Sequence, residues 1–242
     1  MSKGTKERAA AKRIVEQQRA AEKRRAVTLW TSIVVVAVLV IAGLIGWGAL
    51  AGQDGDAGRV TTPPTAVDEG TAFAFGDGPV RIDVYEDFMC PACREFESAS
   101  GAALQQMITD HKATVQFHPI AILDRYSNGT EYSTRAAATA AAAAAGGRFR
   151  EYHDTLYANQ PAEGSDGLDD AKLIELGRSV GLTDASFADA VNGRAYTGWA
   201  TQVTETASAR GVTGTPTVKV NGKQLANPTA ITLQQAVAAA AR

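Results

Sequence analysis

The chain has two cysteines, Cys90 and Cys93, and they are separated by Pro91 and Ala92. Before them lies Val80–Glu86, a β-rich run in which apolar residues alternate with polar ones, as in a strand with one buried face. From Pro91 onward the apolar residues recur at helix-like spacings, and proline suits the first helical turn because its missing N–H costs nothing there. The sequence therefore predicts a dithiol at the point where a strand passes into a helix, with Cys90 at or beside the helix N-terminus.

A thiol at a helix N-terminus should be more acidic than a free one. The unpaired N–H groups and the dipole of the first turn stabilise an anion, so we expect the pKa of Cys90 to lie below the usual value of about 8.5. Cys93 lies one turn inside the helix, so we expect it to be less exposed and to be the resolving thiol. Arg94 would favour the Cys90 thiolate, whereas Glu86 and Asp87 would oppose it.

Three other interpretations of the cysteine pair compete with a redox role. The pair could be half of a zinc site, but the sequence has no further cysteine and its histidines are scattered, so we predict no metal. It could be a structural disulfide, although closing so small a loop removes little entropy from the unfolded chain. The thiols could also be inert and buried. We favour a redox-active dithiol, which needs no cofactor besides its own disulfide. The histidines are expected at structural or surface positions: His111, His118 and His153.

The chain before the dithiol divides into segments of different composition. Residues 1–28 contain nine Lys or Arg and three Glu, a net charge of +6. Residues 29–50 contain no charged residue, and a helix of that length spans about 33 Å, enough for a bilayer core. Residues 51–72 are rich in Gly, Asp, Thr and Pro and have few large apolar residues. We predict a basic cytoplasmic tail, a single transmembrane helix and a flexible linker, in that order.

The charge distribution predicts an orientation in the membrane. Positive charge before the span indicates a cytoplasmic N-terminus, with the remaining chain outside the cell membrane, where disulfides persist. A cleaved signal peptide is the alternative, because Ala49–Ala51 resembles a small-residue cleavage site, but the apolar stretch and the basic region are both long for one. The chain after residue 28 has a net charge of −8, which argues against nucleic acid as a partner of the folded part.

Downstream of the dithiol helix, another strand and a long helical region follow. Ala113–His118 is strand-like, and residues 131–210 contain helical stripes separated by glycines but no good strand. We therefore predict a helical insert. Thr217–Val220 predicts a further strand, Asn221–Gly222 a hairpin turn, and Ile231–Ala241 a final helix.

The order strand, Cys-Pro-Ala-Cys, helix, strand, helical insert, Thr-Pro, hairpin and helix resembles the thioredoxin superfamily, and within it the DsbA-like thiol–disulfide oxidoreductases. More narrowly, it is similar to the membrane-anchored members found in high-GC Gram-positive bacteria. The resemblance covers residues 73–242 and is carried by three stretches: Glu86–Cys93, Arg135–Asn159 and Gly211–Thr217. It implies an α/β, thioredoxin-like fold with an inserted helical domain, preceded by a single N-terminal transmembrane helix.

The resemblance also implies roles for individual residues. Cys90 would be the nucleophile, Cys93 the resolving cysteine, and Pro216, which directly precedes a strand, a cis-proline that faces the dithiol. Thr215 would present its backbone to an extended substrate strand. The predicted substrate-binding residues are Pro91, Ala92, Thr215 and Pro216.

One position departs from the family pattern. Many relatives carry a buried acidic residue six positions before the first cysteine, where it is thought to relay protons to the second. Here that position is Val84, and Asp83 and Glu86 lie nearby. The sequence therefore leaves open which group handles the proton of the second thiol.

These expectations together predict a membrane-anchored, extracytoplasmic oxidoreductase. It would oxidise cysteine pairs in secreted or cell-envelope proteins, and its partners would be reduced or misoxidised secreted proteins. As the resemblance implies, a quinone-linked thiol oxidase in the membrane would accept the electrons and recycle the enzyme. A reductase or isomerase would use the same residues and differ in reduction potential. A tethered binding or chaperone module with an incidental dithiol is an alternative of another class. A copper-delivery protein of this fold would usually show a wider cysteine spacing and a well-placed histidine, and the sequence shows neither.

Overall fold

The computed structural model describes residues 60–241. The predicted basic tail (1–28), the predicted transmembrane helix (29–50) and residues 51–59 of the predicted linker lie outside the described residues. Among the residues that are described, no helix is both long enough and apolar enough to cross a membrane.

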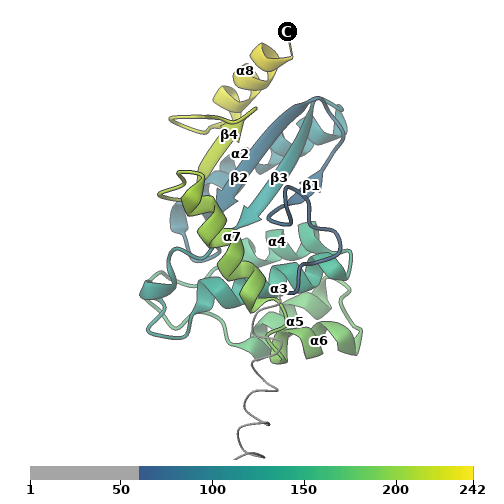
Figure 1. Ribbon diagram of the computed structural model, residues 1–242, viewed down its shortest axis with the longest axis vertical. Coiled ribbons are helices and arrows are strands. Elements are labelled where there is room, and N and C mark those ends of the chain that lie inside the picture. The colour runs from purple at the N-terminus through teal and green to yellow at the C-terminus, as the bar shows by residue number, and fades with distance from the viewer. Residues whose placement is uncertain (1–59, 242) are drawn as a thin grey trace, which may run out of the picture. The chain divides into compact units, whose positions relative to one another are not determined.

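Five strands form one mixed sheet in the spatial order β1-β3-β2-β4-β5 (Figure 1). The strands are β1 (Phe73–Phe75), β2 (Val80–Glu86), β3 (Ala113–Pro119), β4 (Thr217–Val220) and β5 (Lys223–Gln224). The central strand β2 runs parallel to β3 and antiparallel to β4, so both of its edges are paired. The strands predicted at 80–86, 113–118 and 217–220 are confirmed, and so is the hairpin that joins β4 to β5.

The central strand is also buried on both faces. Ile82 and Val84 are fully buried, as their alternation predicted. Asp83 and Tyr85, which point to the opposite face, are buried as well, so the prediction of a strand with one exposed face is wrong. The reason is that helices packed on the sheet leave little of β2 open to solvent. The strand that leads to the dithiol is thus paired on both edges and covered on both faces.

Two helices pack beside the sheet near the dithiol. Helix α2 (Pro91–Thr109) follows the cysteines and contacts β3, while α8 (Ala230–Ala240) contacts α2 and β4. Thr229, the N-cap residue of α8, forms a reciprocal capping box with Thr232, in which each side chain accepts a hydrogen bond from the other residue's backbone N–H. The predicted final helix is confirmed within one residue at each end.

The predicted helical insert is confirmed as five helices. They are α3 (Tyr132–Ala145), α4 (Phe149–Ala158), α5 (Asp170–Ser179), α6 (Ala185–Asn192) and α7 (Thr197–Ala209), preceded by the 3₁₀ turn η1 (Asp124–Tyr126). Figure 1 shows α3 to α6 grouped at one end of the sheet. The alanine-rich α3 contacts α4, α5, α6 and α7 and is buried from its first residue to Ala144. Small side chains let several helices approach it closely, which explains why a nearly all-alanine segment forms the centre of the insert.

Residues 60–72, expected to be the end of a flexible linker, instead pack on the folded domain. The indole Nε1 of Trp199 donates to the carbonyl of Gly70 at 2.5 Å, and Arg210 forms an ion pair with Asp68. Thr71 is buried, and its carbonyl lies 3.0 Å from the ring nitrogen Nδ1 of His118. The glycine- and proline-rich composition indicated few apolar contacts, but backbone carbonyls and acidic side chains make the attachment. The domain therefore begins to pack before residue 73.

Candidate active site at the strand–helix junction

The structure places the dithiol where the sequence predicted it. Strand β2 ends at Glu86, three buried residues follow, and Cys90 is the N-cap residue of α2 with Pro91 as the first helical residue. The backbone at Cys90 is extended, with φ −74° and ψ 116°, and its N–H donates to the carbonyl of Asp87 at 2.9 Å. The chain thus makes a tight turn directly before the helix and presents the first sulfur at the helix N-terminus.

A buried carboxylate holds that turn. Asp87 accepts hydrogen bonds from the backbone N–H of Met89 (2.9 Å), the backbone N–H of Leu123 (2.9 Å) and the hydroxyl of Ser133 (2.7 Å). Burial raises the pKa of Asp87 to about 6, although these hydrogen bonds oppose the rise. The sequence suggested that Asp87 would act as a charge opposing the thiolate, whereas the structure shows that it joins the active-site turn to the helical insert.

The two thiols differ strongly in acidity. The pKa of Cys90 is lowered to about 6, chiefly because the Cys93 thiol donates a hydrogen bond to its sulfur; partial burial opposes this, and Thr215 and the backbone N–H groups of Cys93 and Ala92 lower the pKa further. The pKa of Cys93 is raised well above its usual value by burial, by its bond to Cys90 and by the negative charge of Glu86. Cys90 is 7 % exposed and Cys93 is fully buried. At neutral pH the reduced pair therefore consists of a slightly exposed thiolate on Cys90 and a fully buried, protonated thiol on Cys93.

The segment before β4 contacts the dithiol. The peptide bond between Thr215 and Pro216 is cis, as the sequence predicted, and the sulfur of Cys90 lies 3.4 Å from the carbonyl oxygen of Thr215. Thr215 and Pro216 are half-buried, whereas Pro91 and Ala92 are exposed. The structure thus brings Thr215 against the dithiol from a position 125 residues away in the sequence.

A residue that the sequence analysis did not identify also contacts this turn. The side-chain amide of Gln160, just after α4, donates to the carbonyl of Cys90 at 2.9 Å and to the carbonyl of Phe88 at 3.1 Å. Gln160 lies in a loop of the insert, and no sequence pattern marks a loop glutamine as a partner of a backbone 70 residues away. It provides a second link between the helical insert and the active-site turn.

Comparison with known proteins agrees with this geometry. A sequence model of a family described as thioredoxin matches residues 72–239. The chain belongs to this thioredoxin family. Among solved structures, oxidised DsbA of Mycobacterium tuberculosis is 32 % identical, with a TM-score of 0.60 over 69 % of this chain and 90 % of that one. Reduced DsbG of the same organism, a disulfide bond oxidoreductase, is 29 % identical, with a TM-score of 0.58 over 75 % of this chain and 89 % of that one.

A curated relative extends the comparison to a larger protein. The serine/threonine-protein kinase PknE of Mycobacterium tuberculosis is 29 % identical over 151 residues, which is 58 % of this chain and 26 % of the kinase. The chain thus spans about a quarter of the length of that relative. The close structural neighbours of the present chain are the thiol–disulfide oxidoreductases of the DsbA and DsbG type. The described domain has their fold and carries two neighbouring cysteines at the start of a helix.

The thioredoxin-family domain has a buried acid beside its second cysteine, at a position different from the expected one. Val84 is fully buried in the sheet, and Glu86, two residues further along the same strand face, is the buried acid whose charge acts on Cys93. Its carboxylate lies 2.5 Å from Nε2 of His153, and Nδ1 of that histidine lies 2.9 Å from Asp154. The sequence analysis left the choice between Asp83 and Glu86 open; strand periodicity could have favoured Glu86, because residues 84 and 86 share a face, but it gives no indication of His153 on α4.

Proposed function

We propose that the chain is a membrane-anchored, extracytoplasmic thiol–disulfide oxidoreductase that oxidises cysteine pairs in secreted or cell-envelope proteins. The observation that carries the proposal is the asymmetry of the dithiol. Cys90 has a pKa near 6 and is 7 % exposed to solvent, whereas Cys93 is fully buried and keeps its proton. A nucleophilic thiolate backed by a protonated thiol is the arrangement that exchange through a mixed disulfide requires.

In the proposed reaction the disulfide between Cys90 and Cys93 accepts two electrons from a substrate. A substrate thiolate attacks the sulfur of Cys90, the enzyme disulfide breaks, and the sulfur of Cys93 leaves and takes up a proton. A second substrate thiolate then attacks the first substrate sulfur in the mixed disulfide and releases Cys90 as a thiolate. The substrate gains a disulfide and the enzyme is left reduced. A low pKa of Cys90 favours this direction because it stabilises the leaving group and the reduced enzyme.

The surface around the dithiol suits an extended polypeptide. The Thr215 carbonyl lies against Cys90, and the peptide to Pro216 is cis. Pro91 and Ala92 are exposed beside the reactive sulfur. A substrate strand could pair with the backbone at Thr215 while its cysteine reaches Cys90, a form of β-augmentation.

The membrane anchor and the recycling partner are proposed from the sequence. The uncharged stretch 29–50 after a tail with a charge of +6 supports a single span with a cytoplasmic N-terminus, which places the dithiol outside the cell membrane. A reduced enzyme there needs an electron acceptor, and a quinone-linked thiol oxidase in the same membrane is the proposed partner.

A trapping experiment tests the proposal. We expect the Cys93→Ser variant of the full chain to accumulate mixed disulfides with substrate proteins, visible as slow bands on non-reducing gels that disappear with a reductant. Cys90→Ser should accumulate none, and neither variant should oxidise a dithiol peptide. If Cys93→Ser trapped nothing while Cys90→Ser did, the nucleophile assignment would be wrong. If the Cys90→Ser, Cys93→Ser double variant kept the full activity of the protein in cells, the proposal of an oxidoreductase would be wrong, and a binding or chaperone module would be the better interpretation.

A further inference from the structure

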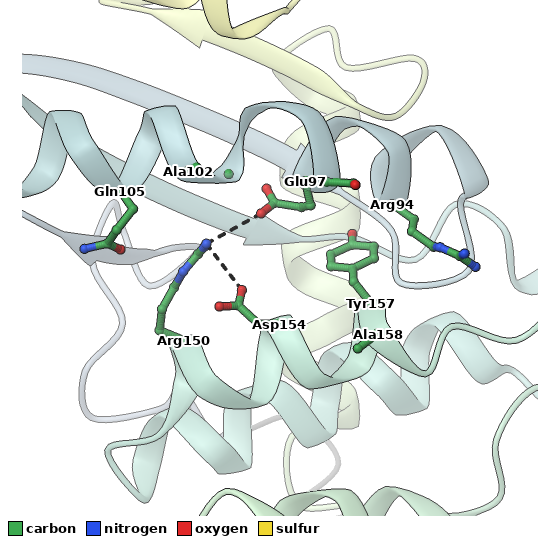
Figure 2. A pocket seen from close by; sticks show the side chains of 10 residues that line it. Arg94, Glu97, Ala102, Gln105, Arg150, Asp154, Tyr157 and Ala158 are labelled. Atoms are coloured by element: carbon green, nitrogen blue, oxygen red, sulfur yellow. Dashed lines mark ion pairs between the residues drawn. The ribbon is translucent and has the colours of Figure 1, made fainter.

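A pocket beside the dithiol is not used by the exchange reaction. It has a volume of about 510 Å³, opens between α2 and α4, and is lined on the α2 side by Arg94 and Glu97 and on the α4 side by Arg150, Asp154 and Tyr157. Figure 2 shows Arg150 reaching from α4 toward Glu97 and Asp154, with the hydroxyl of Tyr157 directed to the same region. Arg150 thus joins Glu97 of α2 to Asp154 of α4 across the pocket.

Three potential metal ligands from three different elements meet behind this wall. Glu86 ends β2, Glu97 lies on α2 and His153 lies on α4, and one ligand atom of each lies within 4.8 Å of the other two. Two ligands of a tetrahedral zinc ion, each bound at about 2.0–2.2 Å, lie about 3.4 Å apart. The ligand atoms of this cluster lie at most 4.8 Å apart, so none of them would have to approach another by more than about 1.4 Å, and the 2.5 Å contact between Glu86 and His153 would have to open by about 1 Å.

The carboxylates in this cluster have unused oxygens. Within the described part of the chain, Oε2 of Glu86 and Oε1 of Glu97 are buried and have no hydrogen-bond partner. The side chain of Glu86 is fully buried and that of Glu97 is 8 % exposed. An unpaired carboxylate oxygen away from water is costly, so both atoms indicate a missing partner at this place. Glu97 lines the pocket, which gives an ion a route from solvent.

The surroundings of His153 are those of a metal-binding imidazole. Nδ1 lies 2.9 Å from the carboxylate of Asp154, so in the neutral ring the proton sits on Nδ1 and the lone pair of Nε2 faces Glu86. Asp154 is itself held by Arg150 at 3.3 Å. Arg150 also lies 3.5 Å from Glu97 and would oppose a cation, but its charge is matched by Asp154. Two acids, Glu86 and Glu97, remain to neutralise an ion.

We propose that Glu86, Glu97 and His153 form a binding site for a divalent transition-metal ion of the Zn²⁺ type, reached through the pocket between α2 and α4. One imidazole nitrogen and two carboxylate oxygens are ligands that zinc accepts, and solvent in the pocket supplies the fourth. Asp154 is the outer residue that orients the imidazole. Neither cysteine is among the proposed ligands, so the existence of the site does not depend on the proposed oxidoreductase activity.

Zinc titration of the full chain in detergent tests the site. The Cys90–Cys93 disulfide is kept closed, because free thiols bind zinc themselves. Competition with a chromophoric chelator should show one Zn²⁺ per chain, and cobalt added instead should give the visible absorption of a tetrahedral complex. Glu97→Gln should weaken binding by at least about 100-fold, and Asp154→Asn by about 10- to 100-fold.

Matched controls separate this site from surface binding. His111→Gln and Glu151→Gln change an exposed histidine and an exposed acid of α4, and both should leave zinc affinity unchanged. His153→Gln should abolish binding, and circular dichroism checks that the protein with this buried substitution still folds. If it does not fold, the zinc affinities of Glu97→Gln and Asp154→Asn test the site instead. Binding that is absent from the parent protein, or that is equal in Glu97→Gln, Asp154→Asn and the parent, would overturn the proposal.

Discussion

Cys93 lowers the pKa of Cys90 more than any other neighbouring group does, and substitution of Cys93 tests this directly. The hydrogen bond from the Cys93 thiol is the largest cause of the lowered pKa. Cys93→Ala removes the donor, whereas Cys93→Ser replaces it with a hydroxyl of similar reach. We therefore expect the pKa of Cys90 to stay close to 6 in the serine variant and to rise above about 7 in the alanine variant.

The size of the effect follows from the two ionisation states. With a pKa of about 6, Cys90 is roughly nine-tenths thiolate at pH 7. A thiol with the usual pKa of about 8.5 would be only about 3 % thiolate at that pH. The alanine variant keeps the contact with Thr215 and the backbone N–H groups of the helix start, so its thiolate fraction should fall to less than about half rather than to the free value.

Ultraviolet absorbance of the thiolate, followed through a pH titration of each reduced variant, measures this pKa. The rate of Cys90 alkylation against pH provides an independent reading, because the thiolate is the reactive form. Equal pKa values in the two variants would refute the reasoning, since the helix N-terminus and Thr215 would then account for the acidity without Cys93.

Three further predictions concern the same domain. Because Cys90 ionises near pH 6 while Cys93 stays protonated, reduction of the disulfide takes up two protons below pH 6 and one above it. As the pH rises, the reduction potential should therefore fall by about 59 mV per pH unit below pH 6 and by about 30 mV per pH unit above it. A single slope from pH 5 to pH 8 would contradict this. Gln160→Ala removes two hydrogen bonds to the active-site turn and should lower the free energy of unfolding in urea by about 1–2 kcal/mol, whereas Asn159→Ala, at an exposed neighbour, should change it by less than about 0.5 kcal/mol. Trp199→Phe loses the donor to Gly70 and should speed proteolysis within residues 60–72; an unchanged cleavage rate would mean that other contacts hold this segment.

Sequence periodicity predicted the regular elements well because their causes are local. The alternation of Val80–Glu86, the proline at the start of α2 and the glycines just after α3, α5, α6 and α7 each act within a few residues. The position of Cys90 as N-cap followed from the same signals. The place of the thiolate could thus be predicted before any tertiary contact was known.

The features that sequence reasoning missed depend on contacts between distant segments. Glu86 at the end of β2 and His153 on α4 are 67 residues apart and meet only in the tertiary structure. Gln160 reaches the active-site turn across 70 residues. Residues 60–72 attach through backbone carbonyls, which every sequence has, so composition alone indicated a free linker. In each case the partner is chosen by the tertiary fold rather than by local pattern.

The reduction potential of the Cys90–Cys93 pair is the measurement that tests the central claim most directly. The purified protein is equilibrated with glutathione buffers of known potential, and the fraction oxidised is read from trapped thiols. The account predicts a reversible couple well above about −200 mV, where strong oxidants lie. A value near about −270 mV would contradict the oxidase and favour a reductase. The absence of any reversible couple would contradict the redox role of the dithiol altogether.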